Sequence, residues 1–477
     1  MTVRRTGGDD GGVADRIPTS RIARAHRLGR AVAREVLRDT GVRLSMVGRS
    51  EELRARLAEK QTLRAADQLF TILGGMKGAA MKVGQTMSLL DLDMFPESHR
   101  ERFRERLADL CDQAPRMPFP QLRSVLEADL GPMREVFAEF DTEPLAAASI
   151  GQVYRATLRD GRAVAVKVQY PGIEEAVRAD LENLRLFAAF WRPMLPALAD
   201  SRVLEEVSLA ITGELDYLAE ARAQRHMAHR YRDHTLVHVP DVVAPLCTRR
   251  VLVSDLVDGR PFVTGAELPA SHRKRIAEIV YRFYVGSLYR DNEYCGDPHP
   301  GNVLLGADGR VAFVDFGLFH RMRPEYVRFE IDCVRAAVEG RAEDLRTLLV
   351  RRGVIDPTTP VPAEECLEYI AATAWWSLVD EEVTVTGDIA TTAFARAVDP
   401  RADAVVQRVD NLPAEHLFSR RAELMTFGTI GSLTATNNWH RIAREWIYGD
   451  PPITAVGREF ARHRAESPTD PPPGSGG

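Results

Sequence analysis

Two short segments decide the fold: Asp297-Pro298-His299-Pro300-Gly301-Asn302 and Val314-Asp315-Phe316-Gly317. The residues between them, 302–313, read as a short hairpin with a turn at Asp308-Gly309. Such a hairpin returns Asp315 to the side of Asn302, and carboxylate and amide oxygens are ligands that Mg²⁺ accepts in proteins. The two segments therefore predict a magnesium–phosphate site with Asn302 and Asp315 as metal ligands.

The spacing of these residues is typical of phosphoryl-transfer enzymes. Kinase-fold enzymes orient the acceptor and hold metal ions on the phosphates with a D-x-x-x-x-N loop followed by D-F-G. A D-F-G triplet alone is a weak signal, but the joint pattern of Asp297, Asn302 and Asp315 is specific. It predicts that the phosphate chemistry is centred on these three residues.

A second motif, Val164-Ala165-Val166-Lys167, lies at the end of a predicted hairpin over 153–168. The alternation puts Lys167 on the strand face opposite Val166. A lysine at this place in kinase-fold enzymes reaches the α- and β-phosphates. Alone it reads as an ordinary exposed strand residue; together with the downstream loop it predicts nucleotide binding.

Such a lysine needs a carboxylate to hold it, and the segment 214–220 (ELDYLAE) offers three on one predicted helix. Asp216 and Glu220 are four residues apart and so share a helix face, whereas Glu214 and Asp216 do not. For any single one of them, a solvated helix face is the alternative interpretation.

The third motif, residues 144–153 (PLAAASIGQV), stands where a kinase has its glycine-rich phosphate loop. Alanine replaces most of the glycine, and Cβ atoms limit how closely the backbone can approach phosphates. We therefore expect nucleotide binding to be tuned differently from that of an ordinary protein kinase. The predicted nucleotide-binding residues of this loop are Ala146, Ala147, Ala148, Ser149 and Gly151.

Net charge, cysteine spacing and the distribution of apolar residues exclude several classes of protein. The 477-residue chain has a net charge of -5 and a pI near 6.2, which argue against nucleic-acid binding. The five cysteines lack metal-binding spacing and indicate a reduced interior. With no secretory h-region and no run of about 18 apolar residues, we expect a cytoplasmic protein without a transmembrane helix. Only five of the 63 basic residues are lysine, which suggests a GC-rich bacterial source.

The order of patterns predicts an α+β protein with two lobes and an N-terminal helical extension. The expected extension is 20–115, with an unusually glycine-rich helix at about 70–91. Its first helix, 20–40, is amphipathic and basic, which fits either peripheral contact with an anionic membrane or docking on the protein. The remaining expected units are disordered tails at 1–19 and 466–477, an N-lobe with inserted helices at 116–258 and a helical C-lobe at 259–465.

From about residue 70 to 320 the chain resembles the UbiB/AarF/ADCK family of atypical kinases. Four features carry the likeness: Lys82-Val83-Gly84-Gln85, the AAASIGQV loop, the ELDYLAE segment, and DPHPGN with DFG. The resemblance implies a two-lobed protein-kinase-like fold. It also implies that the glycine-rich helix folds over the nucleotide cleft and blocks the place of a protein substrate.

The resemblance also implies roles for single residues. Lys82, Gln85, Glu214 and Asp216 would be regulatory, the last two facing the cleft. Glu220 would pair with Lys167, and Asp297 would be the catalytic aspartate. The segment 254–257 would form the hinge beside adenine, with Asp255 and Val257 at the nucleotide. One departure is Cys295, because family members often carry a histidine before the small residue that precedes the catalytic aspartate. A second departure is the absence of the C-terminal transmembrane helices that some members have.

The activity that the resemblance implies is ATP- and Mg²⁺-dependent hydrolysis or phosphoryl transfer. It would support isoprenoid-quinone or other lipid metabolism, with a lipid, a quinone precursor or quinone-pathway enzymes as partners. Two alternatives stay open. One is a small-molecule phosphotransferase like the aminoglycoside and choline kinases. The other is a non-enzymatic module that uses the nucleotide to gate the binding of a lipid or a partner.

Overall fold

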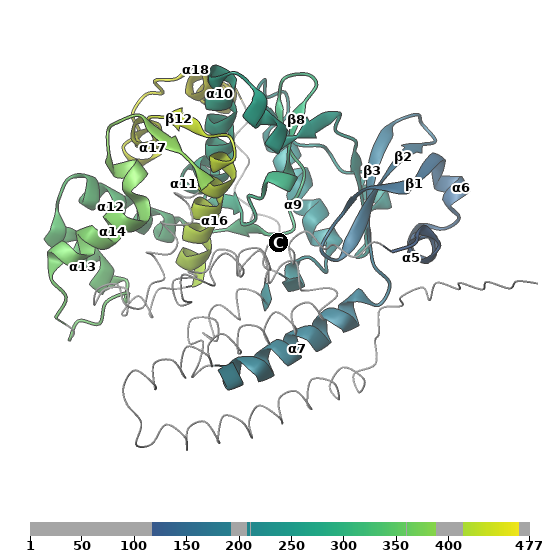
Figure 1. Cartoon of the computed structure of the whole chain (residues 1–477), viewed down its shortest axis with the longest axis horizontal. Helices are drawn as coiled ribbons and strands as arrows, with labels where there is room; N and C mark the ends of the chain where they lie inside the picture. The colour runs from purple at the N-terminus through teal and green to yellow at the C-terminus, as the bar shows by residue number, and fades with distance from the viewer. Residues whose placement is uncertain (1–116, 192–207, 210, 359, 388–413, 467–477) are drawn as a thin grey trace, which may run out of the picture.

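The computed structural model describes residues 117–191, 208–209, 211–358, 360–387 and 414–466. Lys82, Gln85, the glycine-rich helix, the amphipathic segment 20–40 and both expected tails lie outside the described residues. The described part is an α+β protein in which a small antiparallel sheet precedes a mainly helical region (Figure 1).

The first sheet has the order β1-β2-β3-β5, all antiparallel. On β3 the valines are buried, whereas Ala165 and Lys167 on the other face are partly exposed, as the alternation predicts. Helix α5 packs on β3 and helps to close a core around Leu122, Tyr154 and Val166. The elements of this region are α5 (Phe119–Leu130), α6 (Met133–Val136), β1 (Phe137–Ala147), β2 (Gly151–Leu158), β3 (Ala163–Gln169), α7 (Ile173–Trp191), α9 (Tyr217–Arg230), η2 (Ala244–Leu246) and β5 (Val251–Asp255).

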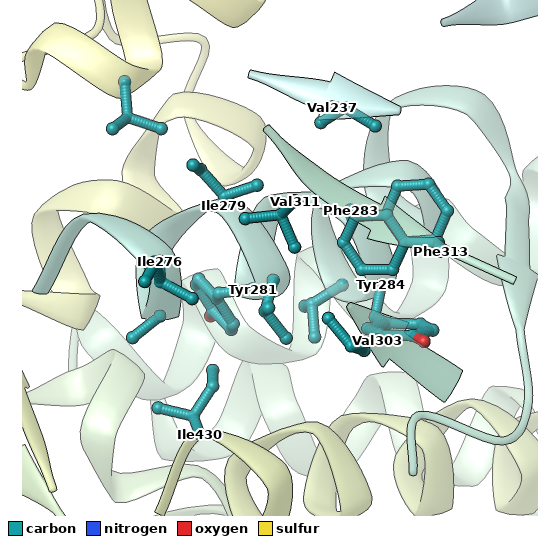
Figure 2. Packing of buried hydrophobic residues seen from close by; sticks show 14 of the residues in the cluster. Val237, Ile276, Ile279, Tyr281, Phe283, Tyr284, Val303, Val311, Phe313 and Ile430 are labelled. Carbon is teal, nitrogen blue, oxygen red and sulfur yellow. The ribbon is translucent and has the colours of Figure 1, made fainter. Parts of the chain in front are cut away.

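The predicted hairpin after Asn302 is present as β8 (Val303–Gly306) and β9 (Val311–Phe313), with Gly309 at φ 81° in its turn. It belongs to a second sheet of order β4-β9-β8-β6, completed by β4 (Val237–His238) and β6 (Gly259–Pro261). Figure 2 shows how this sheet meets the helices: Phe313 stacks on Phe283, with ring centroids 3.6 Å apart. The hairpin is thereby anchored to the helical core.

Helices dominate the rest of the chain. They surround a core that includes Trp439, Phe427 and Tyr281, and α10 and α16 run side by side within it (Figure 1). The elements are η3 (Phe262–Glu267), α10 (Ala270–Tyr281), the π-helix η4 (Arg282–Gly286), α11 (Ser287–Asp291), β7 (Glu293–Cys295), η5 (Pro300–Asn302), β10 (Phe319–Arg321), α12 (Pro324–Val338), α13 (Ala342–Arg351), α14 (Ala363–Leu378), β11 (Val383–Val385), α16 (Ala414–Gly431), β12 (Ala435–Asn437), α17 (Trp439–Ile447) and α18 (Ala455–Glu466).

Helix α9 joins the two regions. Its first half, including Tyr217 and Ala221, packs into the core beneath the first sheet. Its second half, including Met227 and Ala228, packs into the helical core. In Figure 1 α9 accordingly lies between the strands β1–β3 and the helical region. Among the described residues, none of the helices combines the length and apolar character needed to cross a membrane.

One predicted element was wrong in extent. The segment 214–220 is not one helix, because α9 begins only at Tyr217. Asp216 is its N-cap: the side chain accepts hydrogen bonds from the amides of Leu218 (3.0 Å) and Ala219 (3.1 Å). The expected i,i+4 relation between Asp216 and Glu220 within a helix therefore does not exist.

Candidate active site

The centre of the candidate site is an ion cluster around Lys167. Its Nζ lies 2.8 Å and 3.0 Å from the two carboxylate oxygens of Glu220 and 3.4 Å from Oδ2 of Asp315. Lys167 projects from β3, Glu220 from the first turn of α9, and Asp315 follows β9. Three segments far apart in sequence thus meet at one ammonium group.

Burial and neighbouring charge shift the ionisation of this cluster. Burial alone would lower the pKa of Lys167, but Asp315 and Glu220 outweigh it and raise that pKa well above its ordinary value. Burial raises the pKa of Glu220 to about 7, although Lys167 opposes the shift. Lys167 therefore stays a cation between these two carboxylates.

Tyr217 is a part of the site that the sequence reasoning missed. The Lys167 ammonium lies 5.0 Å from its ring centroid, a cation–π contact within the usual range. A Cβ at Gly151 would stand 2.9 Å from the Tyr217 hydroxyl and 2.3 Å from the Val168 carbonyl oxygen. The signal in the sequence was an aromatic residue directly after Asp216, but nothing local indicates that it packs beneath Lys167.

The loop from Asp297 to Asn302 is held by a two-stranded ribbon. Strand β7, which leads to Asp297, pairs with β10, which follows the D-F-G segment. Beyond β7, the Gly296 amide donates to the Leu318 carbonyl at 2.7 Å. Thr429 on α16 donates to the Pro298 carbonyl, so the loop is also tied to the helical core. The ribbon brings buried Asp297 and the segment of Asp315 into one place.

Asn302 and Asp315 are brought together by the hairpin. The Asn302 carbonyl accepts the Val314 amide at 3.1 Å, which puts Asp315 next to Asn302. The Asn302 side-chain nitrogen donates to the Asp297 carbonyl at 3.1 Å, a contact that does not use its side-chain oxygen. Asp315 Oδ1 accepts the Gly317 amide at 3.0 Å. Both groups are thus oriented by backbone contacts.

The loop within the alanine-rich segment 144–153 is shorter than expected. Ala146 and Ala147 belong to β1 and pair with Val153 and Gln152 on β2. Only 148–150 connect the strands, closed by a hydrogen bond from the Ala148 amide to the Gly151 carbonyl at 2.8 Å. The close approach of Gly151 is to the protein's own backbone at Val168, as described above, which explains why glycine stands there.

The Glu214 side chain accepts a hydrogen bond from the Ser149 hydroxyl. A Cβ on Gly317 would be 3.8 Å from Glu214 Cγ and 3.7 Å from Glu220 Oε2. Gln169, which the sequence reasoning did not single out, donates to the Glu214 carbonyl at 3.3 Å. Glu214 therefore links the alanine-rich loop to the D-F-G segment, whereas Asp216 is occupied in capping α9.

The expected hinge connects β5 with β6. Two of its backbone amides already donate hydrogen bonds within the protein. The Asp255 amide donates to the Asp241 carbonyl at 2.9 Å, and the Leu256 amide donates to the Ala163 carbonyl at 3.1 Å. The Asp255 side chain is 44% exposed and lies 3.9 Å from Arg162. Val257 is half-buried. The hinge contacts of Asp255 and Val257 with adenine remain predictions.

No group of three or more His, Cys, Asp and Glu side chains within the described ranges is arranged to hold a metal by itself. A divalent ion between Asp315 and Asn302 would therefore draw its other ligands from a nucleotide and water, as Mg²⁺ commonly does in kinases. The donor set, one carboxylate and one amide oxygen, fits that role.

Comparison with known proteins gives a consistent answer. A family model described as the ABC1 atypical kinase-like domain matches residues 109–349, just over half of the chain. Rat "Atypical kinase COQ8B, mitochondrial" is 31% identical over 292 residues, covering 59% of this chain and 54% of that protein. Mouse "AarF domain-containing protein kinase 1" is 30% identical over 317 residues, covering 63% and 58%. The chain thus spans about half the length of these curated relatives.

A solved structure is similar over nearly its whole length. The complex of Rv3197 with erythromycin, from Mycobacterium tuberculosis, superposes with a TM-score of 0.58 at 32% sequence identity. The match covers 83% of this chain and 98% of that one. A kinase-like family implies a nucleotide ligand, in agreement with the cluster around Lys167. On these grounds the chain belongs to the ABC1/UbiB family of atypical kinases.

Proposed function

We propose that this protein binds Mg-ATP and hydrolyses it or transfers its terminal phosphoryl group. The observation that carries the proposal is the Lys167 ammonium held between Glu220 and Asp315 beside Asn302. Lys167 would contact the α- and β-phosphates, and Glu220 would hold its orientation. Asn302 and Asp315 would bind Mg²⁺, which neutralises charge that develops on the phosphates.

Asp297 would accept the proton of the attacking hydroxyl or water. It is buried at the end of the β7–β10 ribbon, and Asn302 is fixed to its carbonyl. Ala146, Ala147, Ala148, Ser149 and Gly151 would cover the phosphates, with Asp255 and Val257 beside adenine. In a two-lobed kinase-like arrangement, the helix that carries Lys82 and Gln85 would close the cleft and restrain activity, together with Glu214 and Asp216.

We further propose, on the resemblance to the UbiB/AarF/ADCK family, that the activity supports isoprenoid-quinone or other lipid metabolism. The partners would be a lipid, a quinone precursor or quinone-pathway enzymes, with peripheral membrane contact through 20–40.

The test is steady-state ATP hydrolysis by the purified chain with magnesium, with and without anionic liposomes and a quinone-precursor-like phenol. We expect turnover that rises with lipid or phenol and that falls by about 10²–10⁴ in Asp297→Asn, the contribution typical of acid–base catalysis. Turnover that is insensitive to this substitution would reject the role of Asp297.

The second candidate function is a nucleotide-gated binding module. The related Rv3197 structure is a complex with erythromycin, a ligand that is not a nucleotide. Tight ATP binding with no turnover under any of these conditions would favour such a module, because binding and switching use the same phosphate-contacting residues.

A further inference from the structure

A cavity of about 640 Å³ lies away from the candidate active site. Its walls come from the end of α9, the connection to β4, η4, α11 and α18. Cavities of this volume commonly hold small organic ligands. None of Lys167, Asp297 and Asp315 contributes to the lining, so the cavity is a separate feature.

Arginine dominates the polar lining. Arg230 Nη1 and Arg464 Nη1 approach the same carboxylate, Asp291, at 2.9 Å and 2.8 Å. Arg230 Nη1 also lies 3.3 Å from Glu293, yet among the described residues it has no partner with hydrogen-bond geometry. Arg232 adds an exposed guanidinium at the rim. Arg230 and Arg464 therefore share the Asp291 carboxylate.

A second ion group lies next to the first, because Arg290 directly precedes Asp291 on α11. Arg290 lies 2.6 Å from Glu445, but Glu445 also holds Arg282 at 2.6 Å. Burial, and after it repulsion from Arg282, lowers the pKa of Arg290 even beside Glu445. Arg282 also holds Glu278 at 2.8 Å, so this pair of guanidinium groups meets two carboxylates, whereas Arg230 and Arg464 converge on Asp291.

A buried histidine adds an uncommitted donor. His234 is 1% exposed, and its Nδ1 accepts the amides of Leu236 (3.0 Å) and Val237 (3.2 Å). An accepting Nδ1 places the ring proton on Nε2, which has no hydrogen-bond partner in the part of the chain that the structure describes. Burial keeps the ring neutral by lowering its pKa to about 3.

The remaining wall is aromatic. The Phe460 ring meets His234 edge to face with centroids 4.6 Å apart, and Tyr231 lies 6.4 Å from Phe460. Such a wall suits a ring or another apolar group on the ligand.

We propose that this cavity is a binding site for a small organic phosphate. Guanidinium groups form paired hydrogen bonds with phosphate oxygens, and Arg230, Arg290 and Arg464 supply them. His234 Nε2–H offers a further donor, and the aromatic wall receives the organic part. The site is independent of the proposed ATP site, because it uses none of the same residues.

The test is calorimetric titration of phenyl phosphate and of inorganic pyrophosphate into the full chain at low ionic strength. The variant is Arg464→Gln, with Arg462→Gln as its matched control on the same helix. The two side chains are similarly exposed, 54% and 61%, but only Arg464 lines the cavity. We expect binding about tenfold weaker in Arg464→Gln, since a lost charged hydrogen bond has that size, and no change in Arg462→Gln.

Asp291→Asn should change the affinity for phenyl phosphate in the opposite direction. It removes the carboxylate that competes for Arg230 and Arg464, so phenyl phosphate should bind more tightly than to the wild type. Three results would overturn the proposal: no heat of binding from either probe at millimolar concentration, equal losses in Arg464→Gln and Arg462→Gln, or binding that both arginine variants leave intact. The last would place the ligand in the cleft or elsewhere.

Discussion

Two buried ion clusters in this protein differ in their net charge. In the cleft, one ammonium, Lys167, faces two carboxylates, and the Asp315 side chain remains 30% exposed. Within the helical core, Arg282 is fully buried and bonded to Glu278 and Glu445, while Arg290 shares Glu445. The second cluster balances two cations with two carboxylates.

The difference is one of charge compensation, because the second cluster is balanced and the first keeps one carboxylate in excess. The charges of a buried ion pair must compensate each other, because an uncompensated charge in the interior is costly. Arg282 meets this condition with hydrogen bonds from Nε, Nη1 and Nη2 to the two glutamates. The Lys167 cluster keeps one carboxylate in excess, and the partly exposed Asp315 is the residue that we propose as a ligand of Mg²⁺.

The largest effect is expected for Arg282→Met. It leaves Glu278 and Glu445 in the core without their main partner, and breaking a buried pair from one side costs about 3–5 kcal/mol. Urea unfolding followed by tryptophan fluorescence measures this. The control is Arg441→Met, whose pair with Asp380 is exposed and should contribute about 1 kcal/mol or less. Equal losses in the two variants would refute the structural role of the buried cluster.

The next effect concerns the cleft cluster. Asp315→Asn removes the extra carboxylate, so ATP affinity measured with magnesium should fall by about tenfold or more, or about 1.4 kcal/mol. Without magnesium the variant and the wild type should differ little. Asp308→Asn, in the exposed turn of the same hairpin, is the control. If magnesium-dependent affinity is unchanged in Asp315→Asn, the metal assignment is wrong.

A smaller effect tests how α9 supports the cleft. Asp216→Ala removes the N-cap and should lower the free energy of unfolding by about 1 kcal/mol. Glu214→Gln should leave unfolding nearly unchanged, because that side chain contacts Ser149 rather than a helix end. Thermal unfolding of both variants distinguishes them. Should Glu214→Gln destabilise as much as Asp216→Ala, the separation of their roles would fail.

The smallest effect is expected at the alanine-rich segment. Ala147→Gly loosens the end of β1 beside the cleft, at a cost of about 0.5–1 kcal/mol for glycine in a strand. ATP and ADP affinities should shift a few-fold, measured by titration with each nucleotide. Ala138→Gly, exposed near the other end of β1, is a comparison for the general effect of strand glycine. If neither affinity moves, this segment does not cover the nucleotide.

Local chemistry made much of the site predictable. The D-x-x-x-x-N and D-F-G spacings, the hairpin between them and the strand that bears Lys167 all follow from neighbours in sequence. The start of α9 was misjudged because helical periodicity extends through Leu215, whereas the chain breaks where Asp216 turns its carboxylate onto the next amides. Helix propensity does not account for a side chain that accepts the backbone amides in place of the preceding helical turn.

The sequence by itself determined the α+β class, the hairpin and the residue types that phosphate chemistry needs, because short-range patterns encode them. Tertiary structure alone decided which groups meet. It brought Glu220 to Lys167, as the family resemblance implied, and it placed the Tyr217 ring beneath that lysine. It also gathered Arg230, Arg290 and Arg464 around one cavity. The physical reason is that charge compensation and burial are satisfied between segments distant in sequence, and no local pattern records which of them will be neighbours.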